Sequence, residues 1–311
     1  MNYVGNTSGG LGSWAACKLV AAEHGADRLR LLFADTLIES DGLYRFLVES
    51  AANVLGVACP EPVAAMADDL PSPEADMPAR KLALAAMRAA ANAHFGGRLV
   101  WLADGRTPWE VYRDERFLGN SRVDPCSKIL KRQLLDRWFN EHCERPTTHR
   151  VVGLGWWERH RFDGDGKKPG LRARMAAKGW TFIAPLIDHK PTLDRYDLRA
   201  WADREGLSVS AAYYDGFEHD NCGGRCSKAG QSHWLRMLRL RPEAFAGAER
   251  EETALRDLLG DVAMMSEQKK GKKYPLPLTT FRQRIEAGDE LCLVGGSPCG
   301  CFSGTDEDDE S

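Results

Sequence analysis

Roughly the first two hundred residues alternate between short apolar runs and longer stretches in which apolar residues recur at helical spacing. Short apolar runs are typical of strands buried on both faces of a parallel sheet, and the longer stretches are typical of helices that cover it. The expected strands are residues 3–6, 29–34, 99–103 and 150–154, with a further apolar run at 181–186. The expected helices are residues 14–24, 43–55, 81–94, 129–139 and 194–206. This alternation predicts an α/β fold with a doubly wound, mostly parallel sheet of the Rossmann-like type.

The pattern changes after about residue 208. Cysteine, glycine and aromatic residues become frequent, and only residues 234–240 and 249–259 look helical. A basic run follows at 268–273, and the acidic end at 306–311 is expected to be disordered. We therefore expect an α/β domain over residues 1–208 and a Cys-rich, partly helical extension over residues 209–311.

Composition limits the class of protein. The chain has 311 residues, of which 43% are hydrophobic and 28% charged, as in a soluble protein with a sizeable core. It has no apolar run of about 18 residues and does not begin like a signal peptide, so no membrane contact and a cytoplasmic location are expected. In that reducing compartment the nine cysteines are expected to be thiols, metal ligands or catalytic groups. The net charge of −3 gives no global sign of nucleic-acid binding, although local basic segments remain candidates.

A glycine-rich segment, Ser8-Gly9-Gly10-Leu11-Gly12-Ser13, lies between the first expected strand and the first expected helix. Glycines allow a sharp turn and let the backbone approach a phosphate closely. Exposed amides and the helix N-terminus attract the anion, and the serines add hydroxyl donors. An ordinary glycine turn capped by Ser13 is the alternative, because short glycine patterns are weak signals.

The glycine segment resembles the Ser-Gly-Gly-x-Asp-Ser signature of the PP-loop superfamily, the adenine nucleotide alpha-hydrolase-like proteins. It departs once, because Gly12 stands where the family usually has Asp. Three later segments are similar to the same superfamily in the same order: Phe-Ala-Asp-Thr at 33–36, the Cys-containing basic stretch at 124–131, and the glycine-then-Glu-Arg stretch at 153–161. Together they cover roughly residues 1–200. The chain most resembles the phosphoadenosine phosphosulfate (PAPS) reductase-like proteins of phages and bacteria.

The resemblance implies that an adenine nucleotide, ATP or PAPS or adenosine phosphosulfate (APS), binds with Mg²⁺ beyond the carboxyl ends of the strands. The residues that it assigns to nucleotide binding are Ser8, Gly9, Gly10, Gly12, Ser13, Asp35 and Gly153. Asp35 is expected to hold Mg²⁺ or a ribose hydroxyl, with a helix cap as the alternative. Lys128, Arg159 and Arg161, together with Lys131, are candidates to neutralise phosphates during catalysis, although each alone also suits an ordinary surface.

Two cysteine pairs mark the C-terminal third, Cys222 with Cys226 and Cys299 with Cys301, and Cys126 is a fifth candidate. Thiolates favour zinc or iron–sulfur clusters. Neither spacing is that of the usual zinc ribbon, and some PAPS reductases carry clusters, so we expect a [4Fe–4S] cluster held by four of the five cysteines. A structural zinc site and a set of unrelated buried thiols are the alternatives. Lys228 is expected near the same cavity, and His219 and His233 as hydrogen-bonding neighbours of the metal.

The expected function is an enzyme that adenylates an acceptor, releases pyrophosphate and so prepares the acceptor for sulfur transfer. The acceptor is a nucleic acid or a small molecule, and the basic segments at 167–168 and 269–273 suit a phosphate backbone or are solvated loops. One alternative is a PAPS or APS reductase that releases sulfite with a thioredoxin-like donor, although the Glu-Cys-Gly-Leu-His motif of assimilatory reductases is missing. Another is a non-catalytic nucleotide-binding subunit of a modification or defence complex. The acceptor, the sulfur donor and the oligomeric state stay open.

Overall fold

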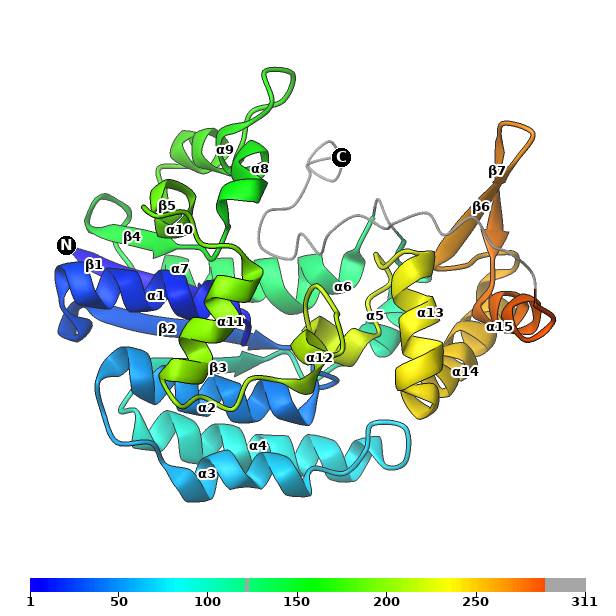
Figure 1. Cartoon of the computed structure of the whole chain (residues 1–311), viewed down its shortest axis with the longest axis horizontal. Coiled ribbons are helices and arrows are strands. Elements are labelled where there is room, and N and C mark those ends of the chain that lie inside the picture. Colours follow the sequence, from blue (N-terminus) through cyan, green and yellow to red (C-terminus); the bar gives the residue numbers. More distant parts are fainter. Residues whose placement is uncertain (121–122, 289–311) are drawn as a thin grey trace.

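The computed structural model describes residues 1–120 and 123–288, and its centre is a five-stranded parallel sheet with the strand order β3-β2-β1-β4-β5 (Figure 1). The strands are β1 (Asn2–Thr7), β2 (Leu29–Asp35), β3 (Leu99–Ala103), β4 (Thr148–Val151) and β5 (Thr181–Ile183). β1 pairs in register with both β2 and β4, for example Gly5 with Leu31 and with Val151. The expected α/β fold with a parallel, Rossmann-like sheet is confirmed.

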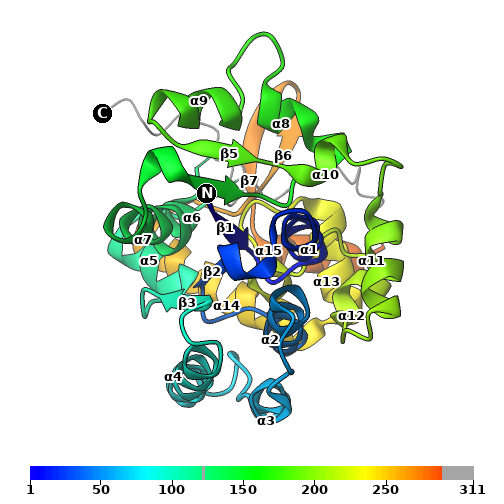
Figure 2. The same cartoon turned by 90° about the vertical axis from the view of Figure 1, so that its left-hand side faces the viewer.

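Helices cover both faces of this sheet. Helices α1 (Leu11–His24), α2 (Asp41–Leu55) and α4 (Met77–His94) share a buried apolar cluster with one face, and α7 (Leu134–His142) and α9 (Leu171–Ala177) share another with the opposite face (Figure 2). Side chains alternate along each strand, so Leu31 and Phe33 of β2 face the first cluster while Leu32 and Ala34 face the second. α2 begins at Ser40, whose hydroxyl accepts a bond from the Leu43 amide, and ends at a left-handed Gly56.

Shorter elements connect these. They are α3 (Glu61–Ala65), α6 (Pro125–Ser127), α8 (Arg159–Asp163), α10 (Pro185–Asp188), α11 (Arg195–Arg204), α12 (Ala211–Tyr214), the 3-10 turns η1 (Ala26–Arg28), η2 (Met66–Asp69), η4 (Arg145–Thr147), η5 (Trp156–Glu158) and η6 (Asn221–Gly224), and a π-helical turn η3 (Lys128–Gln133) that leads into α7.

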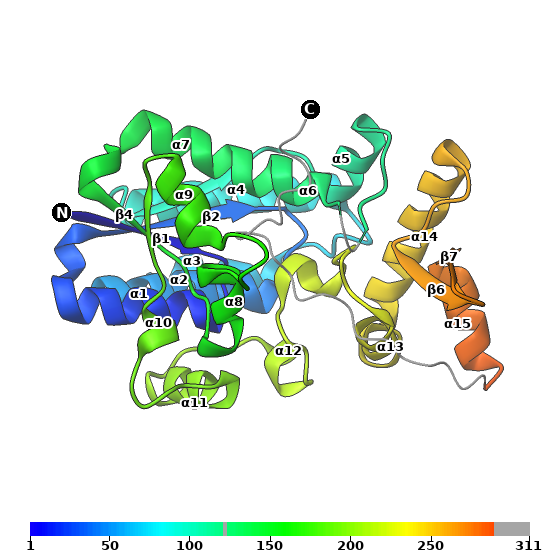
Figure 3. The same ribbon diagram turned by 90° about the horizontal axis from the view of Figure 1, so that it is seen from above.

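A second apolar core lies beyond the carboxyl ends of the strands (Figure 3). It is built by α5 (Pro108–Asp114), α13 (Gln231–Leu240), α14 (Pro242–Leu259), α15 (Leu278–Glu286) and an antiparallel hairpin of β6 (Met265–Lys269) and β7 (Lys272–Leu276). Its largest members include Trp109 and Tyr112 from α5 beside Trp234, Phe245 and Phe281. α5 therefore packs with the C-terminal elements although it precedes residue 208 in the sequence.

Most expected elements agree with the structure to within a few residues. Two differ in ways that matter for function. The expected strand at 150–154 ends at Val151, and residues 152–154 leave the sheet to line a pocket. The basic run at 268–273 forms the facing ends of β6 and β7 and the turn between them. Among the described residues, no helix combines the length and the apolar character needed to span a bilayer.

Candidate functional site

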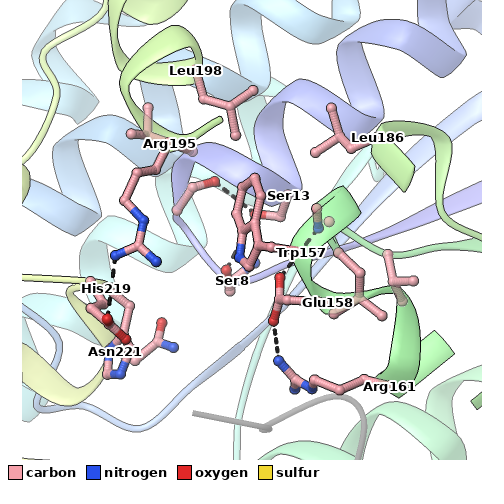
Figure 4. Close-up of a pocket in the computed structure, with 18 of the residues that line it drawn as sticks. Ser8, Ser13, Trp157, Glu158, Arg161, Leu186, Arg195, Leu198, His219 and Asn221 are labelled. Carbon is pink, nitrogen blue, oxygen red and sulfur yellow. Dashed lines mark hydrogen bonds and ion pairs between the residues drawn. The ribbon is translucent and has the colours of Figure 1, made fainter. Parts of the chain in front are cut away.

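A pocket of about 180 Å³ lies where β1 and β4 end side by side (Figure 4). The chain leaves β1 to build β2 and β3 on one side and later returns to build β4 and β5 on the other, so this is the point at which the strand order reverses. Open α/β sheets bind ligands at such points, beyond the carboxyl ends of the strands. Ser8, Gly10, Gly12, Ser13 and Gly153, all predicted from the sequence, line it.

The hydroxyl of Ser13 organises the glycine loop. It donates to the Gly10 carbonyl oxygen at 2.9 Å and accepts from the Ser8 amide at 3.1 Å. It also lies 3.3 Å from the hydroxyl oxygens of both Thr7 and Ser8. Gly9 adopts a positive φ of 73°, which a residue with a side chain rarely does. The loop is thereby fixed at the N-terminus of α1, where the partial positive charge of the helix favours an anion.

Gly12 and Gly153 bring α1 and the end of β4 into backbone contact. A Cβ atom on Gly12 would lie 2.7 Å from the carbonyl oxygen of Gly153, and one on Gly153 would lie 2.3 Å from the backbone nitrogen of Ser13. Both positions therefore need glycine for packing. Position 12 has no room for the Asp that the PP-loop signature usually carries there.

Charged side chains stand on two sides of the pocket (Figure 4). On one side Glu158 accepts a bond from the Gly155 amide at 3.2 Å and pairs with Arg161. On the other side Arg195 pairs with Glu218 at 3.4 Å. Trp157, which is half-buried, adds an indole ring to the lining. Of the predicted basic residues, Arg161 reaches the pocket.

Two buried polar atoms in the lining have no hydrogen-bond partner among the described residues. They are Oδ1 of Asn6, at the end of β1, and Nδ1 of His219. Burial, followed by the charge of nearby His233 and Lys131, lowers the pKa of His219 to about 3, so its imidazole is neutral. Buried polar atoms are normally satisfied, and a bound ligand is one means of satisfying these two. Sequence reasoning placed His219 next to the cysteines and overlooked Asn6.

Asp35 does not line this pocket, contrary to the sequence prediction. Its carboxylate is 1% exposed and accepts bonds from the Leu37 amide, the Tyr44 hydroxyl and the Trp101 indole, at 2.7, 2.7 and 3.0 Å. Burial raises its pKa to about 6, against the opposing effect of these three bonds. Asp35 therefore ties the end of β2 to α2 and β3 and is almost completely shielded from solvent.

Lys128 and Arg159 also lie away from the pocket lining. Lys128 is half-buried on the π-helical turn. Arg159 points to the outside of α8, where its guanidinium pairs with Asp188 at 2.6 Å and Asp163 at 3.4 Å. The Glu-Arg segment thus contributes Glu158 and Arg161, which are three residues apart, rather than Arg159.

The predicted cysteines Cys126, Cys222 and Cys226 meet at a second, small cavity of about 20 Å³. That volume holds roughly one water molecule. The Cys126 sulfur lies 3.1 Å from the hydroxyl of Tyr112, and the Cys222 sulfur lies 4.0 Å from the hydroxyl of Thr36. Lys228 lines the same cavity, as the sequence predicted.

A buried ion pair supports this cavity. Glu39 and Lys131, whose side chains are 0% and 3% exposed, approach to 3.3 Å. Glu39 also accepts bonds from the Thr36 hydroxyl at 2.9 Å and from the Cys222 amide, so it holds the cysteine segment against the end of β2. Burial lowers the pKa of Lys131, but the charge and hydrogen bond of Glu39, together with the nearby Cys222 and Cys126, raise it overall.

The thiols carry protons in this environment. Burial raises the pKa of Cys126 to about 12 and raises those of Cys222 and Cys226 as well, while the positive charge of Lys131 acts in the opposite direction. Within the described residues, no three His, Cys, Asp or Glu side chains converge closely enough to hold a metal ion. The other two predicted ligands, Cys299 and Cys301, lie outside the described residues. The three thiols offer donors suited to zinc or iron–sulfur clusters but do not by themselves form a complete metal centre.

A larger cleft of about 620 Å³ lies between α4, α5 and α14. Its rim mixes acids and bases, including Glu74, Lys81, Arg113 and Glu251. Several of these are already paired, for example Lys81 with Glu110 at 2.8 Å. The cleft has neither a glycine loop nor a strand end in its lining, so it is the weaker candidate for a phosphate ligand.

No protein-family model matches the chain, and no curated protein or solved structure matches it either. The resemblance to the PP-loop superfamily therefore rests on the sequence segments described above. The fold defines an α/β protein with a Rossmann-like parallel sheet and a pocket at its switch point.

Proposed function

We propose that the chain binds an adenine nucleotide in the pocket between β1 and β4, with the phosphates at the glycine loop. The observation that carries this proposal is the position of that loop, at the switch point of the sheet and at the N-terminus of α1. The hydroxyls of Ser8 and Ser13 line the pocket beside it. Trp157 offers an aromatic face to the base, and Asn6 and His219 offer polar atoms that lack a partner among the described residues.

The rim charges suit a polyphosphate. Arg161 pairs with the half-buried Glu158, and Arg195 pairs with the exposed Glu218. Phosphate oxygens are strong, bidentate partners for a guanidinium, so nucleotide binding would draw the arginines inward. Glu158 and Glu218 are then the carboxylates of the lining that are available to a phosphate-bound Mg²⁺.

The reaction that we propose is attack of an acceptor oxygen on the α-phosphate of ATP, which forms an adenylated acceptor and releases pyrophosphate. Sulfur from a donor then displaces the adenylate. The glycine loop would hold the departing phosphates, and Arg161 and Arg195 would balance their charge. A metal centre, either a [4Fe–4S] cluster or zinc, would be held by Cys126, Cys222, Cys226 and either Cys299 or Cys301. It would supply redox or sulfur-binding chemistry.

Two other functions each have one supporting observation. The segment 219–226 contributes His219 to the pocket and two thiols to the small cavity, which suits a PAPS or APS reductase whose thiols receive electrons from a thioredoxin-like donor. The pocket lacks an acid at position 12, where glycine is needed for packing, and Asp35 is buried outside the pocket lining. The lack of these two acids suits a nucleotide-binding subunit without catalysis.

Calorimetric titration with ATP, PAPS, APS and GTP tests the binding proposal. We expect an adenine nucleotide to bind more tightly than GTP, and Ser13→Ala to weaken that binding about five- to tenfold, the effect of one lost hydrogen bond. Ser50→Ala is the matched control, because the Ser50 hydroxyl is equally buried but bonds only within α2, to the Leu47 carbonyl oxygen. Failure of every adenine nucleotide to bind would reject the proposal.

Product analysis then separates the three functions. Pyrophosphate release from ATP in the presence of an acceptor supports adenylation. Sulfite release from PAPS or APS with a thiol donor supports the reductase. Tight binding without either product supports the non-catalytic subunit. Iron, zinc and sulfide analysis after anaerobic purification tests the metal proposal independently of turnover.

A further inference from the structure

Two basic arms project from the same side of the molecule (Figures 1 and 2). The first arm is residues 156–178, which include η5, α8 and α9, and the second arm is the β6–β7 hairpin, residues 265–276. The first arm carries seven Lys and Arg residues against three Asp and Glu, and the second carries four against one. Because the whole chain has a net charge of −3, this concentration of positive charge is a local feature.

The lysines are held at tight turns. In the hairpin, Lys270 and Gly271 both have positive φ, 48° and 77°, as in the two-residue turns that favour hairpins. In the first arm, Asp165 accepts bonds from the amides of Lys167 and Lys168 at 3.0 and 2.9 Å. The turns are thereby fixed, so less entropy is lost when their side chains bind a ligand.

Most of this charge is available to an outside partner. Lys167, Lys168, Lys270, Lys272 and Lys273 are all exposed. None of these five has an ion pair within the described residues, whereas Lys269 pairs with Glu267 at 2.7 Å. Exposed lysines without a local counter-ion are the groups that release condensed counter-ions when they meet a phosphate backbone.

Each arm also exposes an aromatic ring beside its basic residues. Trp156, next to the pocket residue Trp157, is 46% exposed, and Tyr274, next to Lys273, is 45% exposed. Basic residues interleaved with exposed aromatic rings bind single-stranded nucleic acid, because unpaired bases stack on the rings while lysines contact the phosphates. A duplex would leave these rings without a stacking partner.

We propose that the two arms bind a single-stranded nucleic acid across this side of the molecule. The first arm supplies Glu158 and Arg161 to the pocket, so a strand on this arm passes the mouth of the pocket. The binding surface is argued independently of the proposed function. The further inference that the bound strand is the acceptor rests on the proposed function.

Fluorescence anisotropy with labelled oligonucleotides of about 20 residues, as single-stranded DNA, single-stranded RNA and duplex DNA, tests this proposal. We expect either single strand to bind more tightly than the duplex, and the logarithm of the association constant to fall linearly with the logarithm of salt concentration. Each phosphate contact contributes about 0.7 to that slope for single strands. Lys167→Ala with Lys168→Ala, and Lys272→Ala with Lys273→Ala, should each reduce the slope by about 1.4.

The control pair is Arg28→Ala with Arg30→Ala, which removes two exposed positive charges, one at the end of η1 and one at the start of β2, at the amino ends of the strands. It should leave the slope unchanged. Tyr274→Ala should weaken single-strand binding about tenfold, and Tyr274→Phe should restore it, because stacking needs the ring and not the hydroxyl. Arm variants that behave like the control pair, or a duplex that binds more tightly than both single strands, would overturn the proposal.

Calorimetric titration of the same variants with ATP separates this proposal from the proposed function. Arm variants that lose the oligonucleotide but keep ATP affinity support a surface distinct from the nucleotide pocket. If the wild-type chain binds the oligonucleotide but no adenine nucleotide, the proposed function fails while the binding surface stands. If it binds ATP but no oligonucleotide, the binding surface fails alone.

Discussion

The glycine-loop pocket and the thiol cavity lie at the same edge of the sheet but are built in different ways. The pocket is centred on the backbone at the ends of β1 and β4, where glycines are in close contact, and side chains from residues 157–221 complete its lining. The thiol cavity is lined by side chains from segments distant in sequence, near residues 36, 126 and 226, and a buried Glu39–Lys131 pair supports it. The first is therefore sensitive to added atoms, and the second to lost charge.

The largest effect is expected from Lys131→Met, which leaves the buried carboxylate of Glu39 without its counter-charge. Loss of one partner of a buried ion pair costs about 3–5 kcal/mol of unfolding free energy. Lys128→Met is the matched control, because Lys128 lies on the same helical turn, is half-buried and has no ion pair within the described residues. Lys128→Met should lower the free energy of unfolding by less than about 0.5 kcal/mol. Urea denaturation measures both, and equal stabilities would show that the cavity does not depend on the buried charge.

The next effect concerns Asp35, the last residue of β2. Its pKa is raised from 3.8 to about 6, so the folded state binds the proton more tightly than the unfolded state. Stability is then highest below about pH 4 and falls by about 3 kcal/mol as the pH rises through 6. Asp35→Asn cannot titrate. Its NH₂ group would face either the indole N–H of Trp101 or the donors of Leu37 and Tyr44, so at least one donor would lose its acceptor.

Denaturation between pH 4 and pH 7 checks this prediction. The stability difference between wild type and Asp35→Asn should be largest at pH 4 and shrink as the pH rises. Because Asp35 does not line the pocket, ATP affinity of the folded variant should be unchanged. A difference that is independent of pH, or a selective loss of Mg²⁺-dependent ATP binding, would return Asp35 to the nucleotide site.

A smaller effect is expected at Gly12. Gly12→Asp restores the PP-loop signature but places a Cβ atom 2.7 Å from the Gly153 carbonyl oxygen. Overpacking of this kind costs about 1–3 kcal/mol, and Gly12→Ala should cost a similar amount because it adds the same Cβ. Neither variant should gain pyrophosphate release. A Gly12→Asp protein that keeps wild-type stability and cleaves ATP faster would show that the glycine marks a lost acid and not a packing requirement.

The same difference between the two regions explains what could be predicted from the sequence. The glycine loop is a local signal, because its strand, turn and helix are consecutive in the chain, and Ser8, Ser13 and Gly153 line the pocket as expected. Cys126, Cys222 and Cys226 line one cavity, which depends on long-range packing, and their role as metal ligands stays a prediction.

The residues that lie outside the pocket, contrary to expectation, are of types compatible with two environments. Asp35 follows a buried strand, as a ligand-binding acid often does, but Tyr44 and Trp101 satisfy it from α2 and β3. Arg159 and Arg161 are two residues apart on a helix, so they face different directions, and the sequence does not say which one faces the pocket. Asn6 and His219 gave no local signal, because what sets them apart is the lack of a nearby partner in the folded chain.

Photolabelling with 8-azido-ATP, followed by peptide mapping, locates a bound nucleotide without assuming a reaction. If the nucleotide binds at the glycine loop, peptides that contain residues 153–161 or 213–221 should be labelled. Excess ATP should prevent this labelling, and Ser13→Ala should reduce it while Ser50→Ala should not. A label in the larger cleft, on peptides that contain Lys81, Arg113 or Glu251, would instead place the nucleotide away from the glycine loop.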